Sequence, residues 1–337
     1  MIKGLRAILL IGLVFLIMVN IAPKPAQSHV KPVNPHASLE ARELLNYLDQ
    51  VSGQGIISGQ HNQPESNFYT DEVFKIAGKY PGLWGNDFRY GKWVKNRQQM
   101  TKEAIRQWQE GKLVTLMYHA TRPLDEPTDG WSSVQGELSQ REWEELVTPG
   151  TPIHQRWLKQ IDQVANYLKQ LRDAKVPVLW RPYHEMNGGW FWWGQKKGEK
   201  GYKKLWQLMY DRYVNYHSLN NLIWVWNPNA PRDDAEPYDA YYPGDKYVDV
   251  LAADVYNNDY RRSHHDQLMK LGGGKPIALG EVGILPSPYV LQQEQPHWVW
   301  FMAWREFLTQ KNDEDFIRHV YEHPFVFTTD EVDLPKP

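Results

Sequence analysis

The sequence contains no cysteine among its 337 residues. Disulfide bonds and lipid attachment through cysteine are therefore excluded. A chain of this size does not need disulfides, because one large core buries enough surface for the chain to fold. Folding is then independent of the redox state that the protein meets.

An excess of basic residues is also lacking, since 38 Lys and Arg stand against 40 Asp and Glu. The formal net charge of −2 gives no electrostatic attraction for nucleic acid, so we expect no nucleic-acid partner. The composition implies no cofactor and no metal.

Only one long hydrophobic run is present, from Ala7 to Val19. Lys3 and Arg6 precede it, and small residues follow at 26–28, which is the layout of a secretory signal peptide. The run is shorter than the roughly 20 residues of a membrane helix. We expect residues 1–28 to be removed and the protein to be secreted to the extracellular space, without membrane attachment after cleavage. An uncleaved anchor is the alternative.

Linkers, low-complexity tracts and internal repeats are absent after a proline-containing lead at residues 29–37. Residues 38–337 therefore form one predicted domain, in which eight short apolar runs alternate with amphipathic stretches. This alternation predicts a parallel (β/α)₈ TIM barrel of the α/β class. The expected strands are residues 55–61, 83–88, 113–119, 176–183, 222–226, 248–256, 276–282 and 298–304. An open doubly wound sheet is the alternative, but no glycine fingerprint follows an early strand.

Four helices have recognisable signals between these strands. Ser38 is expected to cap the first, and Thr101 to open another that ends before a left-handed Gly111. Helical periodicity predicts two more over residues 154–175 and 202–217.

The most informative segment runs from Trp180 to Trp193 and reads WRPYHEMNGGWFWW. It joins an apolar strand to a carboxylate, Glu185, and then to four aromatic rings. Aromatic surroundings raise the pKa of a carboxylic acid, which suits it to donate a proton near neutral pH. Flat rings beside that acid also suit stacking on sugars. The alternative is an aromatic core plug in which Glu185 only satisfies local backbone donors.

Polar residues mark the ends of seven of the predicted strands. In a TIM barrel the chemistry lies at the C-terminal ends of the strands, so these side chains are expected to share one face. They are Asp87, His119, His184 with Glu185, Asn227 with Asn229, Tyr256, Glu281, and Trp304 with Arg305.

Glu281 is the lone acid of an otherwise apolar strand, and burying a charge there is costly unless it is paired or used. The fourth and seventh strands lie on opposite sides of the barrel mouth, so Glu185 and Glu281 can converge across a cleft. Two carboxylates about 5–5.5 Å apart are typical of a retaining glycosidase. We assign Glu281 as the nucleophile and Glu185 as the acid/base.

Four patches resemble glycoside hydrolase family 26, best known for endo-β-1,4-mannanases. They are residues 179–194, 250–256, 279–283 and 301–305, of which the first, with HEMNG followed by WFWWG, is the most specific. The resemblance extends through the chain after residue 28. It implies a (β/α)₈ fold with the acid/base after strand four and the nucleophile on strand seven.

The resemblance also implies roles for further residues. Tyr256 is expected to hydrogen-bond the nucleophile, and His119 and His184 to line the site of cleavage. Trp190 and Trp304 match aromatic positions of the sugar subsites, and Arg305 follows Trp304 as in some members of the family.

Several of these residues have a purely structural alternative. Trp304 is a possible core residue, His119 a barrel histidine, and Asp87 a residue that holds the barrel mouth together without touching substrate. One ring of the pair Trp192 and Trp193 is expected to face the cleft and the other to pack inward. His264 and His265 are expected to form a solvated loop pair, not a metal site.

The sequence departs from better-known mannanases at Tyr118–Pro123 and at residues 233–242, so the sugar is less certain than the reaction. We expect a secreted, monomeric, retaining endo-β-glycanase that hydrolyses β-1,4-mannosidic bonds in mannan, glucomannan or galactomannan. A β-1,3-xylanase or mixed-linkage β-glucanase is the alternative within the family. A non-catalytic carbohydrate-binding barrel is the alternative of another class.

Overall fold

A computed structural model describes residues 30–232 and 234–334. The predicted signal peptide lies outside these residues, so its prediction is untested. Within the described part of the chain, no helix is both long enough and apolar enough to cross a membrane.

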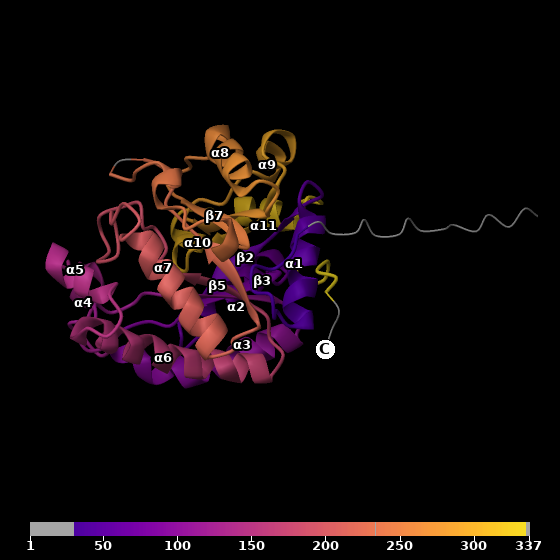
Figure 1. Ribbon diagram of the computed structural model, residues 1–337. Helices are drawn as coiled ribbons and strands as arrows, with labels where there is room; N and C mark the ends of the chain where they lie inside the picture. The colour runs from indigo at the N-terminus through magenta and orange to yellow at the C-terminus, as the bar shows by residue number, and fades with distance from the viewer. Residues whose placement is uncertain (1–29, 233, 335–337) are drawn as a thin grey trace, which may run out of the picture.

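Eight strand positions close into a parallel barrel, as predicted, with helices around it (Figure 1). β9 completes the circle because it pairs with both β8 and β2. The strands are β1 (Ile56–Ile57) and β2 (Gly59–His61), then β3 (Leu83–Asp87), β4 (Leu113–Tyr118), β5 (Val178–Pro182), β6 (Leu222–Trp226), β7 (Val250–Val255), β8 (Ile277–Val282) and β9 (Trp298–Ala303). All eight predicted strands are present, each within two residues of its expected ends.

The first barrel strand is divided at Ser58 into β1 and β2. β1 pairs with β9 on one side and with a short added strand, β10 (Val326–Phe327), on the other, whereas β2 pairs with β9 and β3. The Ser58 hydroxyl donates to the carbonyl of Phe327 at 2.9 Å, which fixes β10 beside the break. No alternation predicts β10, because it contains only two residues.

The helices lie between and around the strands. They are α1 (Leu39–Val51), α2 (Phe68–Ala77), α3 (Arg97–Gln109), α4 (Ser132–Gln135), α5 (Gln140–Leu146), α6 (Pro152–Asp173), α7 (Tyr202–Asp211), α8 (Arg262–Gly272), α9 (Pro288–Glu294), α10 (Phe307–Gln310) and α11 (Glu314–Glu322). Short 3₁₀ turns are η1 (Gly91–Asn96), η3 (Tyr238–Tyr241) and η4 (Asp245–Tyr247), and η2 (Arg212–Tyr216) is a π-helical turn that ends α7.

Two of the predicted helix ends are confirmed and one is wrong. Ser38 caps α1 by accepting from the backbone N–H of Ala41, and Gly111 has a left-handed φ of +91° just beyond α3. Thr101 does not open α3, which begins at Arg97. Its hydroxyl donates instead to the carbonyl of Arg97 at 2.8 Å, so its polar group is satisfied inside the helix.

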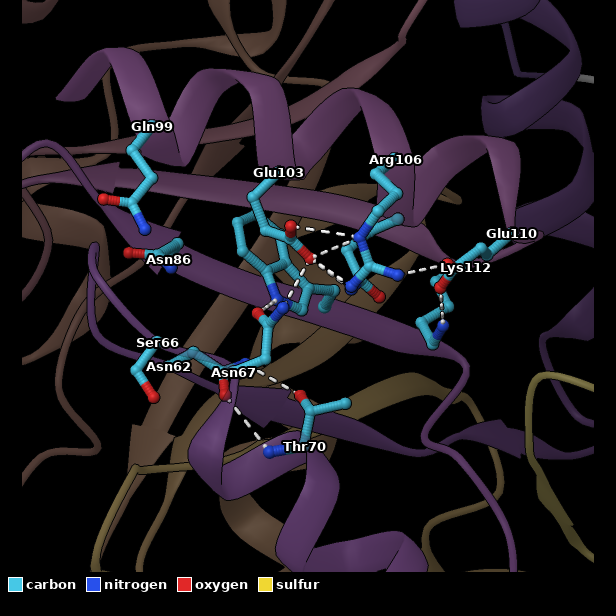
Figure 2. Close-up of polar contacts among 12 residues, drawn as sticks. Asn62, Ser66, Asn67, Thr70, Asn86, Gln99, Glu103, Arg106, Glu110 and Lys112 are labelled. Atoms are coloured by element: carbon cyan, nitrogen blue, oxygen red, sulfur yellow. Dashed lines mark hydrogen bonds and ion pairs between the residues drawn. The ribbon is translucent and has the colours of Figure 1, made fainter. Parts of the chain in front are cut away.

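A polar network anchors the loop between β2 and α2 (Figure 2). The side chain of Asn67 accepts from the indole of Trp84 at 2.8 Å and donates to Glu103 of α3. Glu103 also accepts a hydrogen bond from Nε of Arg106 at 3.1 Å. The loop is therefore fixed to both the barrel and α3, close to the strand ends that carry the candidate site.

Candidate active site

The side chain of Glu281 extends from β8 and is only 3% exposed as a residue. Arg181 of β5 donates from Nη2 to Oε1 at 2.7 Å, and the hydroxyl of Tyr256 donates to Oε2 at 2.6 Å. His184 Nε2 lies 3.8 Å from Oε1. Each carboxylate oxygen therefore has a strong donor, which stabilises negative charge and fixes the direction of the group. The predicted contact between Tyr256 and Glu281 is present.

Glu185 lies in the turn after β5 and approaches from another direction. Its φ is +53°, and Tyr183 two residues earlier has φ +48°, a left-handed conformation that costs side-chain-bearing residues on the order of 1–3 kcal/mol each. The Glu185 N–H donates to the carbonyl of Asn227 at 2.7 Å, which holds the turn against the end of β6. The backbone is thus bent specifically to present this carboxyl group to the barrel mouth.

The carboxyl group of Glu185 meets fewer donors than that of Glu281. Its Oε2 accepts from the indole N–H of Trp190 at 2.6 Å. Burial, followed by the nearby charge of Glu281, raises the pKa of Glu185 to about 8. Glu185 therefore holds a proton at neutral pH and can donate it.

Asp254 of β7 is a third carboxyl group, fully buried beside these two. Its Oδ1 accepts from Asn227 at 2.9 Å and lies 3.4 Å from Arg181, whereas Oδ2 has no hydrogen-bond partner among the described residues. Burial and the charge of Glu281 raise the pKa of Asp254 well above its usual value. A protonated Asp254 can share a hydrogen bond with Glu185.

His184, Glu185 and Asp254 each place one potential metal ligand within 4.8 Å of the others. Both carboxyl groups have raised pKa values, and a protonated carboxyl group is a poor metal ligand. The arrangement fits shared protons better than a bound cation, and the absence of a metal requirement stays a prediction.

His119 follows β4 and is held by Asp87 at the end of β3. Asp87 Oδ2 lies 2.7 Å from the ring Nδ1, and Oδ1 accepts from the His119 N–H at 3.1 Å. Burial alone would raise the pKa of Asp87, but the charge and hydrogen bonds of His119 lower it overall. Both oxygens of Asp87 contact His119, so Asp87 orients His119, and a contact of Asp87 with substrate stays a prediction. The ring of His119 meets that of His184 edge-on at 4.7 Å, which brings His119 next to the two carboxyl groups.

Residues of the site line two cavities, and we name these the acid-side cavity and the His119-side cavity. The acid-side cavity, of about 320 Å³, is lined by Glu185, Trp190, Tyr256 and residues after β6 and β7. The His119-side cavity, of about 170 Å³, is lined by residues that follow β3, β4 and β9. These are Asp87, Arg89, Tyr90, His119, Trp131, Trp304 and Arg305. Trp190 and Trp304 are both half-buried, and they line the acid-side and the His119-side cavity respectively, so Trp304 is not a core residue.

A larger hollow of about 430 Å³ lies on η3 and α8, lined by Tyr238 and Lys270 among others. None of the residues assigned to the site borders it, so its size does not make it the centre of the chemistry.

Two predictions about individual residues are wrong. Trp192 and Trp193 are both buried, and their indole N–H groups donate to the carbonyls of Ala120 and His184 respectively. His264 and His265 are buried in α8, where side-chain acids accept from both rings.

Sequence reasoning missed Arg181, Asp254 and His61. Arg181 and Asp254 are charged residues inside apolar strands, the same signal that identified Glu281, and applied evenly it would have found them. His61 ends β2 and stacks on Trp304 at 4.3 Å, with neither ring nitrogen hydrogen-bonded to a described residue. Burial lowers its pKa well below the usual value, so the ring is neutral.

Comparison with known proteins agrees with the fold. A curated relative from Thermothelomyces thermophilus, named mannan endo-1,4-beta-mannosidase, is 36% identical over 329 residues that cover 92% of this chain. The chain spans 65% of that relative's own length.

Two solved structures are similar along most of both chains. GH26A from Muricauda sp. MAR_2010_75 is 50% identical with a TM-score of 0.87, over 89% of this chain and all of the other. A β-mannanase from a symbiotic protist of the termite Reticulitermes speratus, complexed with a gluco-manno-oligosaccharide, is 29% identical with a TM-score of 0.79. That match covers 90% of this chain and 98% of the other.

The model of glycosyl hydrolase family 26 matches residues 33–331, almost the whole described chain. The family resemblance inferred from the four sequence patches is thereby confirmed. The chain belongs to glycosyl hydrolase family 26.

Proposed function

We propose that this protein is a retaining endo-β-1,4-mannanase. The proposal depends on the contrast between the two carboxyl groups. Glu281 accepts hydrogen bonds from Arg181 and Tyr256, whereas Glu185 is protonated at neutral pH because its pKa is raised to about 8. A negative nucleophile beside a protonated acid is the pair that retaining glycoside hydrolysis requires.

In the first step a carboxylate oxygen of Glu281 attacks the anomeric carbon while Glu185 passes its proton to the leaving oxygen. A glycosyl-enzyme intermediate forms on Glu281 and the leaving sugar departs. Glu185, now negative, removes a proton from an incoming water, which attacks the same carbon and releases Glu281. Arg181 and Tyr256 hold Glu281 in place throughout.

The choice of mannan as substrate rests on similarity. The relative from T. thermophilus bears the name of a mannan endo-1,4-β-mannosidase, and the termite-symbiont enzyme was solved with a gluco-manno-oligosaccharide. Endo action and the polymeric substrate are part of the proposal. Mixed-linkage β-glucan and β-1,3-xylan remain the competing substrates.

We also propose that the enzyme acts outside the cell as a monomer, after removal of residues 1–28. The proposal is supported by the basic start and apolar run of the sequence. N-terminal sequencing of protein recovered from the culture medium tests it. A first residue near position 29 is expected, and an intact start at Met1 on the cell surface would contradict it.

Product release from four soluble polysaccharides tests the activity: glucomannan, galactomannan, mixed-linkage β-glucan and β-1,3-xylan. We expect the wild-type enzyme to cleave the two mannans and the Glu185→Gln variant to be nearly inactive on them. Cleavage of only another polymer would keep the mechanism and replace the substrate. Binding without cleavage of any of the four would contradict the enzymatic function.

A further inference from the structure

Two loops form one wall of the acid-side cavity, where the leaving part of the substrate must lie because Glu185 protonates the leaving oxygen. The loop after β6 contributes Asn229 and Arg232, and the loop after β7 contributes Asn257 and Asp259. These four residues take no part in the proton transfers described above. The position of the two loops nevertheless determines where the leaving sugars can bind.

The loop after β7 has a backbone that needs support. Asn257 and Asn258 have φ of +57° and +59°, which makes them two consecutive left-handed residues with side chains. Such a conformation costs energy and persists only where surrounding contacts hold it. Asp259 makes these contacts: its N–H donates to the carbonyl of Tyr256 at 3.1 Å, and its carboxylate accepts from Arg261 at 2.7 and 2.8 Å. The shape of the loop therefore depends on Asp259.

His264 of α8 joins Asp259 to the loop after β6. α8 packs on β7 (Figure 1), and Nε2 of the His264 ring lies 3.3 Å from Oδ2 of Asp259. On the other side of the ring, Nδ1 lies 3.2 Å from the hydroxyl of Tyr238, which belongs to η3 in the loop after β6. His264 and Tyr238 are each only 3% exposed, so water does not compete for these contacts.

A second link between the two loops is more exposed. Arg261 donates from Nη2 to the carbonyl of Pro231 at 3.2 Å, but its side chain is 56% exposed. Hydrogen bonds in water contribute less to holding a structure than buried ones do. The buried connection through His264 is therefore the stronger of the two.

The proton positions in the chain of Tyr238, His264 and Asp259 follow from their chemistry. Burial alone would raise the pKa of Asp259, but the hydrogen bonds from Arg261 and His264 lower it overall. Asp259 is thus a carboxylate that can only accept, so Nε2 of His264 carries a hydrogen. Burial lowers the pKa of His264, and Asp259 offsets this only in part, so the ring is neutral and Nδ1 accepts. Tyr238, whose pKa is raised by burial, keeps its proton and donates to Nδ1.

Tyr256 precedes the same loop but has supports of its own. Its hydroxyl donates to Glu281 at 2.6 Å, and its ring packs edge-on against Phe307 at 6.1 Å. Loss of the His264 contacts is therefore expected to move the wall of the acid-side cavity more than it moves the donor on the nucleophile.

We propose that His264 is a positioning residue for the acid-side cavity. It donates to Asp259 and accepts from Tyr238, and so holds the loops after β6 and β7 in the arrangement that binds the leaving sugars. His264 is buried and does not itself line the cavity. This inference rests on the proposed function, because that function assigns the acid-side cavity to the leaving part of the substrate.

Two substrates separate this role from a general loss of stability. Every bond of mannopentaose has a sugar as its leaving group, whereas 2,4-dinitrophenyl β-mannobioside releases a phenol that has no sugar hydroxyl groups. Each variant is described by the ratio of kcat/KM for mannopentaose to kcat/KM for the aryl mannobioside. This ratio does not depend on the fraction of folded protein, because unfolded molecules cleave neither substrate.

His264→Leu removes both hydrogen bonds with little change in volume, and we expect it to lower the ratio by about 10-fold. Tyr238→Phe removes only one of the two and should lower the ratio by about threefold. His264→Gln offers an amide N–H to Asp259 in place of Nε2, so it should recover part of the loss. Because the three groups act as one chain, adding Tyr238→Phe to His264→Leu should lower the ratio no further.

His154→Leu and Tyr213→Phe are matched controls, since each removes a buried group bonded to a backbone carbonyl, at 2.8 and 2.9 Å respectively. Neither residue lines either cavity of the site, and the ratio should stay within about twofold of the wild type. A ratio that does not fall in His264→Leu, through equal loss on both substrates or through no loss, would overturn the inference while the wild type remains a mannanase. A wild type unable to cleave mannopentaose would instead overturn the proposed function, and the inference with it.

Discussion

Glu185 and Glu281, two glutamates of the same site, have different hydrogen-bond donors. Glu281 stands on β8, where the pairing with β7 shifts register, and accepts from a guanidinium and a phenol, one on each oxygen. Glu185 stands on a turn with a left-handed backbone and receives one indole N–H, with a raised pKa. The same side chain is therefore prepared for negative charge in one place and for a proton in the other.

The two environments are built from one short segment. Arg181 is the last residue but one of β5 and donates to Glu281, whereas Glu185, four residues later, lines the acid-side cavity. Asn227 connects them, since it accepts from Arg181 at 3.0 Å through its side chain and from the Glu185 N–H through its backbone. The difference in role thus depends on neighbours and backbone direction, because the residue type is identical.

Removing the nucleophile should have the largest effect. Glu281→Ala is expected to lower kcat by on the order of 10⁴-fold or more on every substrate, because the variant lacks the carboxylate that attacks the anomeric carbon. Hydrolysis of mannan and of an activated aryl mannobioside would be compared, with thermal melting as the check on folding. Added azide should restore cleavage of the aryl substrate with inversion, since it attacks from the face that Glu281 vacates. A folded variant with near-normal activity would refute the assignment.

Replacing the acid should have an effect that depends on the leaving group. Glu185→Gln is expected to lower turnover of mannan by about 10²- to 10⁴-fold, because the leaving oxygen no longer receives a proton. An aryl glycoside with a good leaving group does not need that proton, so its first step should be far less affected. A burst of released phenol followed by slow turnover would show this split. If the rate of the first step fell equally on mannan and on the aryl glycoside, Glu185 would not be the acid.

Most of the fold could be predicted from the sequence because the signal is local. Each barrel strand is an apolar run between polar segments, so eight runs gave eight strands. β10 and the break at Ser58 could not be predicted, since they depend on how Phe327 meets the first strand after the barrel has closed. The start of α3 was misplaced because Thr101 can satisfy its hydroxyl inside a helix as well as at a cap.

The positions of the site residues could also be predicted from local signals. Glu185, Glu281 and Tyr256 stand at strand ends, and the barrel brings strand ends together. The raised pKa of Glu185 could be predicted from its aromatic neighbours, but the second cause, the charge of Glu281, depends on how close the fold brings the two carboxyl groups. Trp192 and Trp193 show the converse limit: spacing marks aromatic residues, but only packing decides which face the cleft and which are buried.

The hydrogen bond from the Tyr256 phenol to Glu281 distinguishes the environment of Glu281 from that of Glu185. Tyr256→Phe removes only the hydroxyl group that makes this bond. We expect kcat to fall by about 10- to 100-fold, with KM changed much less, because the donor stabilises and aims the attacking carboxylate. Steady-state kinetics on mannan measures both quantities. Tyr213→Phe, which removes a buried phenol donating to the carbonyl of Ile161, is the matched control. An unchanged kcat would remove Tyr256 from the chemistry.

Removing the hydrogen bond from the Trp190 indole to Glu185 is expected to have the smallest effect, a shift in the pH dependence of kcat/KM. The Trp190 N–H stabilises the carboxylate form, and so lowers the pKa of Glu185, while burial raises it. Because kcat/KM requires the proton on Glu185, activity of the wild type should fall as pH rises through about 8. Trp190→Phe removes the hydrogen bond, raises that pKa and should move the alkaline fall of kcat/KM to higher pH. Trp108→Phe is the control, since its indole N–H has no hydrogen-bond partner among the described residues. An alkaline limb that moved to lower pH in Trp190→Phe would mean that the indole favours the protonated form, and the contrast between the two carboxyl groups would need another cause.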